Sequence, residues 1–371
     1  MATQRGIFVK QVVWFLGLAS LAALSACSAP QRTPAPTQAD SPTPSAATPS
    51  ATASAPTVTP TAGPTSEPPA GFHSDILRSG VSPTSYITDQ CQYYALRWDP
   101  ERSRPGTVVA PIMFHSIVPA GDTPSDAAHI DAPTFYAIIA LAKELGFETI
   151  TSEQLLGFLT TNKKIPERSL LMILDDRRPG TAEEYFLPVN EANDWTTTLA
   201  WPIGDTDQRS GLWDWIERIV ESGYFDVQSH GLEHNIYLNE AMTLEEVQTE
   251  IGGSTPILEA HFGQRPIVYV WPGGNYTQTG VYVARDVGFR LGFTVHSRGP
   301  LAFNWIPQGA EEQAYEDPLL LLPRFWSSAA LLNLQQTADI GDAAWDFAQA
   351  NYANEAAWYA DNCGGELPPL P

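Results

Sequence analysis

The segment SLLMILDD, residues 169–176, decides the fold of this chain. Its apolar run, Leu170–Leu174, predicts a strand that is buried on both faces of a sheet. Strands of this kind are typical of parallel sheets that are covered by helices on both sides. Two adjacent carboxylates, Asp175 and Asp176, follow at the point where the strand ends.

Strand-like and helix-like segments alternate on both sides of this segment. Thr107–Phe114 predicts the preceding strand, and Asp131 predicts the N-cap of a helix between the two strands. Because repeated β–α units imply a parallel sheet, the chain is of the α/β class. The first strand runs into His115 rather than into a glycine-rich phosphate turn, which favours a (β/α) barrel over an open sheet. Further strands are expected at residues 196–200, 225–228, 267–270 and 290–294, capping boxes at Thr181/Glu184 and Thr243/Glu246, and a final helix at residues 342–359.

The N-terminus is predicted to be a targeting segment and a tether. Residues 1–27 combine a basic start with an uncharged apolar run, and they end in Leu24-Ser25-Ala26-Cys27. This ending resembles a bacterial lipobox, in which Cys27 is lipidated; the alternative is an ordinary cleaved signal peptide with a chance cysteine. Residues 28–70 contain eleven prolines and no aromatic residue, so we expect a disordered tether before a folded domain at residues 71–371.

Composition limits the remaining possibilities. The 371 residues include 20 basic and 42 acidic ones, a net charge of −22, which argues against a basic face for nucleic acid. No internal segment is apolar enough for a transmembrane helix, so the membrane is reached only through the predicted lipid anchor. Cys91 and Cys363 either form a disulfide in an oxidising compartment or remain two free thiols; we favour the disulfide.

Three polar clusters follow three of the predicted strands: Asp175-Asp176, then His230 with His234, and finally His115. Each has an ordinary structural explanation, namely a helix N-cap pair, surface histidines and a buried core histidine. Strand ends in a barrel meet at one mouth, however, so the joint occurrence favours a shared site. Two histidines and one carboxylate form an open zinc site, beside which a second carboxylate acts as a base.

At these positions the sequence resembles the polysaccharide deacetylase family, the NodB-homology domains of carbohydrate esterase family four. The motif Thr-Phe-Asp-Asp-Gly corresponds to residues 173–177 (ILDDR), the histidine motif to residues 229–234 (SHGLEH), and the aromatic-proline motif to residues 269–276 (YVWPGGNY). A later motif corresponds to residues 288–294 (GFRLGFT). The segment at residues 110–115 (APIMFH) is similar to the circularly permuted branch of poly-N-acetylglucosamine deacetylases. The resemblance implies a distorted barrel of about seven parallel strands.

The resemblance also implies roles for individual residues. Asp176, His230 and His234 would bind a divalent metal, with zinc the first choice. Asp175 would be the general base for the attacking water, and His115 the general acid for the departing amine; His296 is a lower-ranked candidate for the acid. A backbone N–H near Gly273 would contact the oxyanion. Trp271 and Tyr276 would either form a wall of the sugar site or pack in the core. Arg324 would either orient Asp175 or merely pair with a carboxylate of the barrel.

Arg177 departs from the family pattern, because it replaces the glycine of the first motif. It would narrow the mouth of the site, bind an anionic glycan, or pair with Asp175 and quench the base.

The two carboxylates, the histidine pair and the lipobox together favour one function. It is metal-dependent N-deacetylation of an extracellular or envelope N-acetylglucosamine-containing polysaccharide by a lipid-anchored protein. The alternatives are an O-acetyl esterase of xylan or another glycan, a glycan-binding lipoprotein with a degraded site, and a different hydrolase on the same barrel.

Overall fold

A computed structural model describes residues 67–233 and 236–370. The predicted signal segment with Cys27, most of the predicted tether and the predicted ligand His234 lie outside these residues. Within the described ranges no helix is both long enough and apolar enough to cross a membrane.

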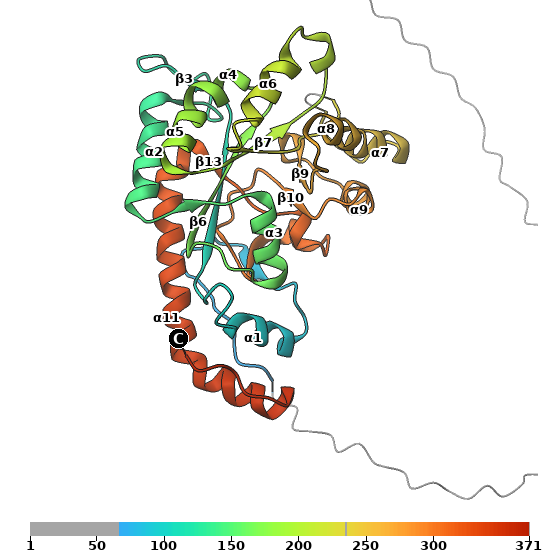
Figure 1. The fold of residues 1–371 in the computed structure, drawn as a ribbon. Coiled ribbons are helices and arrows are strands. Elements are labelled where there is room, and N and C mark those ends of the chain that lie inside the picture. The colour runs from blue at the N-terminus through green and yellow to red at the C-terminus, as the bar shows by residue number, and fades with distance from the viewer. Residues whose placement is uncertain (1–66, 234–235, 371) are drawn as a thin grey trace, which may run out of the picture. The chain divides into compact units, whose positions relative to one another are not determined.

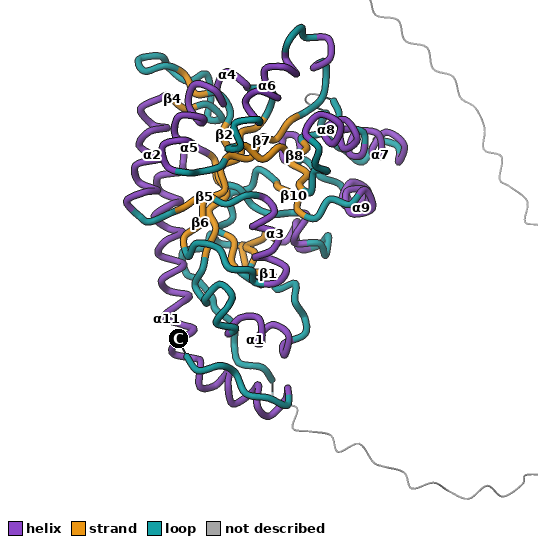
Figure 2. Tube along the Cα trace, viewed as in Figure 1, coloured by secondary structure: helices purple, strands orange, loops and turns teal. Residues whose placement is uncertain are grey.

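A curled parallel sheet forms the centre of the domain (Figures 1 and 2). Its strands follow the order β10-β9-β8-β7-β6-β2-β11, and β11 alone is antiparallel to its neighbour β2. Two short strands, β13 and β5, add to β2 and β6 in parallel. The bounds are β2 Val108–Phe114, β5 Glu148–Thr149, β6 Arg168–Asp175, β7 Thr197–Trp201, β8 Phe225–Ser229, β9 Val268–Val270, β10 Leu291–Phe293, β11 Leu301–Ala302 and β13 Phe325–Trp326.

Residues 322–326 connect the two edges of the parallel sheet, formed by β10 and β2. Leu322 forms an isolated parallel bridge with Phe293 of β10, and Phe325 of β13 pairs with Ile112 of β2. Seven parallel strands, β2, β6 to β10 and β13, therefore curl toward closure. This arrangement confirms the predicted α/β class and agrees with the expected distorted (β/α) barrel.

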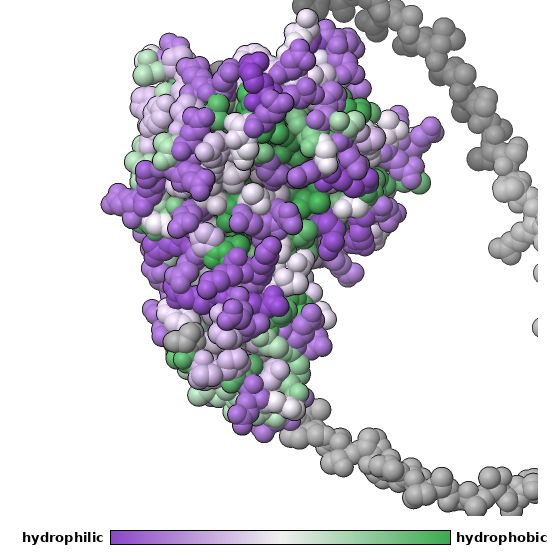
Figure 3. Space-filling model, viewed as in Figure 1, coloured by the Kyte–Doolittle hydropathy of each residue, from purple (hydrophilic) through white to green (hydrophobic). Residues whose placement is uncertain are grey.

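Helices cover both sides of the sheet, which explains why β2 is buried along its whole length. On one side Phe135 of α2 packs against Phe114 of β2 and Phe186, and the long helix α11 adds Leu334. On the other side Leu155 and Phe158 of α3 pack in a second cluster with Val109 of β2. Helices α7 and α9 pack over Tyr269 of β9, on the same face as α2. The bounds are α1 Gln90–Trp98, α2 Ala132–Glu144, α3 Ser152–Thr161, α4 Pro179–Thr181, α5 Leu187–Asn193, α6 Leu212–Val220, α7 Leu244–Gly252, α8 Ser254–Phe262, α9 Gln278–Val287, α10 Ala310–Gln313 and α11 Ala330–Cys363. The face in Figure 3 is mostly hydrophilic, with smaller apolar patches between the helices.

The expected capping box at Thr181 is wrong. Pro179 already occupies the first turn of α4, and Thr181 itself has helical angles and makes no side-chain cap. The helix continues through a π-helical turn, Ala182–Phe186, into α5. By contrast, Thr243 and Glu246 form both hydrogen bonds of the predicted box at the start of α7.

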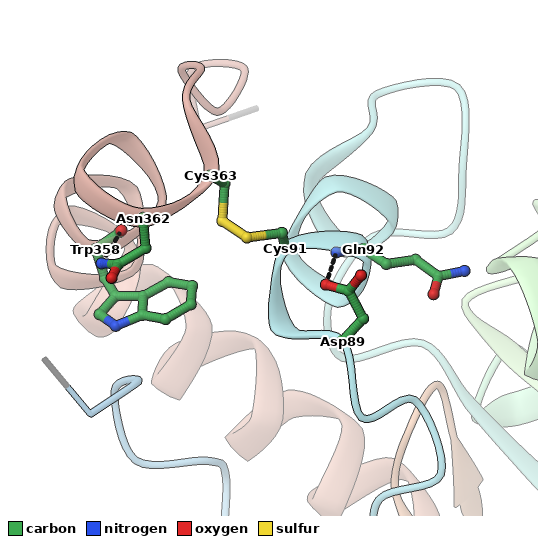
Figure 4. Close-up of a disulfide and its surroundings, with 6 residues drawn as sticks. All are labelled: Asp89, Cys91, Gln92, Trp358, Asn362 and Cys363. Atoms are coloured by element: carbon green, nitrogen blue, oxygen red, sulfur yellow. Dashed lines mark hydrogen bonds between the residues drawn. A yellow bond between two sulfur atoms is a disulfide. The ribbon is translucent and has the colours of Figure 1, made fainter. Parts of the chain in front are cut away.

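The first and last helices are joined at the amino-terminal end of β2. A disulfide links Cys91 of α1 to Cys363 at the end of α11, with Cα atoms 5.5 Å apart (Figure 4). Helix α11 begins twelve residues before the predicted start at residue 342. Two short pairings complete the described fold: β1 Val81–Thr84 is antiparallel to β12 Ile306–Gly309, and β3 Ile117–Val118 is parallel to β4 Ile130–Asp131.

Candidate active site

Strand register brings the predicted catalytic residues to one end of the sheet. Phe114 pairs with Leu174, so His115 and Asp175 leave neighbouring strands at the same level. Trp201 pairs with Ser229, which places His230 at the same edge two strands further on. Together they line a cavity of about 480 Å³, whose walls are His115, Asp126, His129, Asp175, Asp176, Arg178, His230, Tyr237, Gly273, Val295 and Trp326.

Asp175 lies at the bottom of the cavity and is held by a buried arginine. One guanidinium nitrogen of Arg324 donates to both carboxylate oxygens of Asp175, at 2.7 and 3.0 Å. The Nε of Arg324 donates to the carbonyl oxygen of Thr294 at 2.8 Å, and the side chain is fully buried. Arg324 therefore pairs with Asp175, and this contact agrees with both of its expected roles.

Asp176 turns away from the strand because its φ of 68° is left-handed. Its Oδ2 accepts a hydrogen bond from Arg178 at 2.9 Å, and its Oδ1 lies 3.8 Å from Nε2 of His230. Burial by itself would raise the pKa of this carboxyl. This effect of burial is outweighed by the nearby His230 and His115 and by the hydrogen bond from Arg178. The pKa of Asp176 is therefore below its ordinary value. Asp176 is thus kept ionised.

His230 is oriented for coordination. Its Nδ1 lies 2.7 Å from the carbonyl oxygen of Val270, an atom that only accepts, so Nδ1 carries the proton. The lone pair is then on Nε2, which faces Asp176. A histidine that donates its other ring N–H to a backbone carbonyl is the usual arrangement of a metal ligand.

The described residues supply two of the three predicted metal ligands, Asp176 and His230. No group of three His, Cys, Asp or Glu side chains suited to a metal occurs within residues 67–233 and 236–370. Asp176 and His230 have the donor chemistry for a divalent ion, and the free Nε2 of His230 faces Asp176. The third predicted ligand, His234, is outside these ranges and its role stays a prediction.

His115 faces the base from the neighbouring strand. Its Nε2 lies 3.8 Å from Oδ2 of Asp175, and its ring stacks on Trp326 with centroids 6.3 Å apart. Burial lowers the pKa of this imidazole, although the nearby Asp175 and Asp176 work in the opposite direction. His115 is therefore neutral at neutral pH and must gain a proton before it can act as an acid.

The cavity also contains polar residues that sequence reasoning missed. His129 lies with its Nδ1 2.7 Å from Oδ1 of Asp126, and its ring is 6.3 Å from that of His115. Arg178 contacts Asp176, as described, and Tyr237 approaches Gly273. Asp126, His129 and Tyr237 come from loops without periodic patterns; only the position of Arg178, next to the aspartate pair, was a usable signal.

Three expected site residues do not line the cavity. Trp271 is fully buried and donates from Nε1 to the carbonyl oxygen of Leu320, so it packs in the core. Tyr276 packs against Trp271 and Tyr315 instead of facing the cavity. His296, the alternative acid, lies beside Arg324, whose backbone N–H donates to its carbonyl oxygen. For Trp271 and Tyr276 these contacts agree with core packing, the alternative to a sugar-site wall. Tyr237 and Trp326 are aromatic residues that line the cavity.

The structure gives a reason for the residue types at Gly273 and Arg177. Gly273 has φ 61°, and a Cβ there would lie 2.8 Å from the ring of Tyr237, so glycine is required once Tyr237 occupies that side. Arg177 pairs with Asp205 and approaches the carbonyl oxygen of Ile203. Arg177 is directed toward Asp205 and not toward Asp175, so pairing with the base has no support from its contacts.

Comparison with known proteins finds similarity to one family. Residues 162–292 match the family described as polysaccharide deacetylase. YxkH, a Bacillus subtilis protein named for the same family, is 21% identical over 183 residues, which cover 49% of this chain and 63% of that protein. The deacetylase PplD of Streptococcus pyogenes, solved with acetate, superposes with a TM-score of 0.50 at 20% identity over 62% of this chain and 97% of PplD. IcaB from Ammonifex degensii superposes with a TM-score of 0.49 at 17% identity, over 64% of this chain and 98% of IcaB.

The strand order and the cavity at the strand ends thus define a domain of the (β/α) barrel class. Residues 162–292 of this domain match the polysaccharide deacetylase family. The alignment spans less than two thirds of the Bacillus subtilis relative. Membership of the permuted branch stays a prediction.

Proposed function

We propose that this protein removes N-acetyl groups from an extracellular or envelope polysaccharide that contains N-acetylglucosamine. The observation that carries the proposal is the single cavity in which Arg324-bound Asp175 lies next to Asp176 and His230. The contacts of the two adjacent carboxylates differ, because both oxygens of Asp175 accept from Arg324, whereas Asp176 faces His230 and accepts from Arg178.

Asp176, His230 and His234 would hold a divalent metal, with zinc as the first choice. Such an ion supplies Lewis-acid polarisation of the acetyl carbonyl and makes a nearby water more acidic. Asp175 takes the proton of the attacking water as general base. His115, neutral beforehand, receives a proton through the neighbouring Asp175 and delivers it to the departing amine. Trp326 keeps the His115 ring in place by stacking.

Acetate release from N-acetylglucosamine oligomers tests this function. Wild-type protein supplied with zinc or cobalt should release acetate, and a chelator should abolish the release until metal is restored. Asp175→Asn and His230→Ala should each lower kcat by at least about a hundredfold, the scale of lost acid–base or metal chemistry. Unchanged release in either variant, with the fold intact, would reject the assignment.

Ester hydrolysis is the second candidate, because the described residues do not distinguish an amide from an ester. The same preparation is therefore compared on acetylated xylan and on chitin oligomers. Faster release from xylan would make the protein an O-acetyl esterase. A protein purified without chelator that holds no stoichiometric metal and has no activity on either substrate would instead favour a glycan-binding role.

The N-terminal sequence supports a location outside the cytoplasm. We propose that Cys27 is lipidated and that residues 28–70 tether the domain to the bacterial cell envelope. Growth with an alkyne-labelled fatty acid should label the wild-type protein, whereas Cys27→Ala should remain unlabelled and be recovered from the medium. Label retained by Cys27→Ala would exclude this anchor.

A further inference from the structure

Three arginines surround a second, smaller cavity that opens beside the catalytic carboxylates. This cavity, the arginine pocket, has a volume of about 170 Å³ and is lined by Asp176, Arg177, Arg178 and Arg209. Because Asp176 and Arg178 also line the catalytic cavity, a ligand in the arginine pocket would be continuous with one at Asp175.

The guanidinium groups of the arginine pocket have more N–H donors than the nearby acceptor oxygens satisfy. Arg177 and Arg209 share one carboxylate, that of Asp205, and Arg178 uses Asp176 and the hydroxyl of Ser116. The Nε atoms of Arg177 and Arg178 are buried and have no hydrogen-bond partner among the described residues. A buried donor without a partner is costly, so these atoms indicate a missing acceptor.

The pocket is also an electrostatic exception. The chain carries 20 basic residues against 42 acidic ones, yet three arginines meet here around two carboxylates. A strongly acidic surface repels polyanions at a distance, whereas a local excess of guanidinium selects one anionic group held at a fixed position. Arginine is the side chain best suited to this task, since its planar fork bonds carboxylates and phosphates through two nitrogens.

We propose that the arginine pocket binds an anionic substituent, phosphate or carboxylate, of the glycan whose acetyl group lies at Asp175. The inference rests on the proposed function and narrows the substrate class to acetylated glycans that carry an oxyanion near the reacting sugar. The contacts with Asp205, Asp176 and Ser116 leave the Nε atoms of Arg177 and Arg178 without an acceptor, and an oxyanion in the pocket would supply one.

Binding is tested first, on metal-free protein, so that the result does not depend on turnover. Three tetrasaccharide probes are compared by calorimetry: an N-acetylglucosamine oligomer, the same oligomer with a 6-phosphate, and one that contains N-acetylmuramic acid with its carboxylate. We expect at least one anionic probe to bind about tenfold more tightly than the neutral one. The tighter of the two anionic probes identifies the group. Equal affinity for all three would overturn the inference.

The variant Arg209→Gln should remove most of this preference, and Arg209→Lys should retain part of it. Arg209 is half-exposed, so the substitution should leave folding intact. Arg265→Gln removes an equally exposed arginine from a distant ion pair with Glu259 and should leave the preference as in wild type. If Arg265→Gln lowered the preference as much as Arg209→Gln, the effect would be one of total charge and the inference would fail.

Activity then separates this inference from the proposed function. Metal-loaded wild type should show a higher kcat/KM on the anionic probe, and Arg209→Gln should reduce the ratio of anionic to neutral kcat/KM. Hydrolysis of neither probe would overturn the function, while the binding preference would still support the pocket. Hydrolysis of both at equal kcat/KM, with the ratio unchanged in Arg209→Gln, would overturn the pocket and leave the function standing.

Discussion

Arg324 is the residue whose charge decides whether the catalytic carboxylate can exist in its buried position. The pair Arg324–Asp175 is almost completely buried on both sides. Removing one partner of such a pair leaves an uncompensated charge, at a cost of about 3–5 kcal/mol. We expect Arg324→Met to lower the free energy of unfolding in urea by this amount. The double variant Arg324→Met/Asp175→Asn should recover part of the loss; additive losses would show that the two groups do not interact.

Glu250 links the stability of the histidine loop to pH. Its Oε1 accepts hydrogen bonds from the backbone N–H groups of Leu232 and Glu233, at 3.0 and 3.3 Å, next to His230. Burial raises the pKa of this carboxyl to about 7, against an ordinary value of 4.5, although the two N–H groups oppose the rise. Between these values the folded protein binds more protons than the unfolded chain, so the free energy of unfolding falls as pH rises.

The variant Glu250→Gln should lose that dependence, since its amide oxygen still accepts but does not titrate. Between pH 5 and pH 8 the wild type should lose up to about 3 kcal/mol more than the variant, measured by urea unfolding. Glu245→Gln, an exposed position on the same helix, is the matched control and should follow wild type. Parallel curves for wild type and Glu250→Gln would contradict the expectation.

At the scale of elements, the sequence predicted long strands well and short ones poorly. Leu170–Leu174 is recognisable because burial on both faces demands a continuous apolar run. The two residues of β13 have no such pattern, since their pairing with β2 depends on chain more than two hundred residues away. The same limit applies to the site. Asp175 and His115 directly follow strands and were predicted, whereas His129 is brought in by a loop whose course only tertiary packing determines.

The two capping boxes expected from sequence give a matched test at this scale. Thr243 accepts from the backbone N–H of Glu246, and the Glu246 side chain accepts from Thr243 in return. Thr181 makes no side-chain cap. Thr243→Ala should therefore lower the free energy of unfolding by about 1 kcal/mol, and Thr181→Ala by less than about 0.5 kcal/mol. Thermal and urea unfolding measure both; equal losses would show that the caps do not differ.

For the folded domain as a whole, the Cys91–Cys363 disulfide closes a loop of 272 residues that contains the entire curled sheet. A link across so long a loop restricts the unfolded chain strongly, and removing a native disulfide typically costs about 2–5 kcal/mol. Packing also holds the helices it joins, because Trp98 of α1 donates to Glu355 of α11 at 2.6 Å and Tyr94 packs against Trp358. The domain should therefore remain folded without the bond, but less stable.

Activity should respond differently from stability, because the disulfide and the catalytic cavity lie at opposite ends of β2. Tyr94 of α1 and Thr107 border one cavity before the strand begins, whereas His115 borders the catalytic cavity after the strand ends. Cys91→Ala/Cys363→Ala, or dithiothreitol treatment of wild type, should lower the free energy of unfolding by about 2–5 kcal/mol and leave kcat/KM at 25 °C unchanged. Dithiothreitol should have no further effect on the double variant. If reduction did not shift the unfolding midpoint of the wild type, the disulfide would contribute no stability. If kcat/KM fell together with stability, the two ends of the barrel would be coupled.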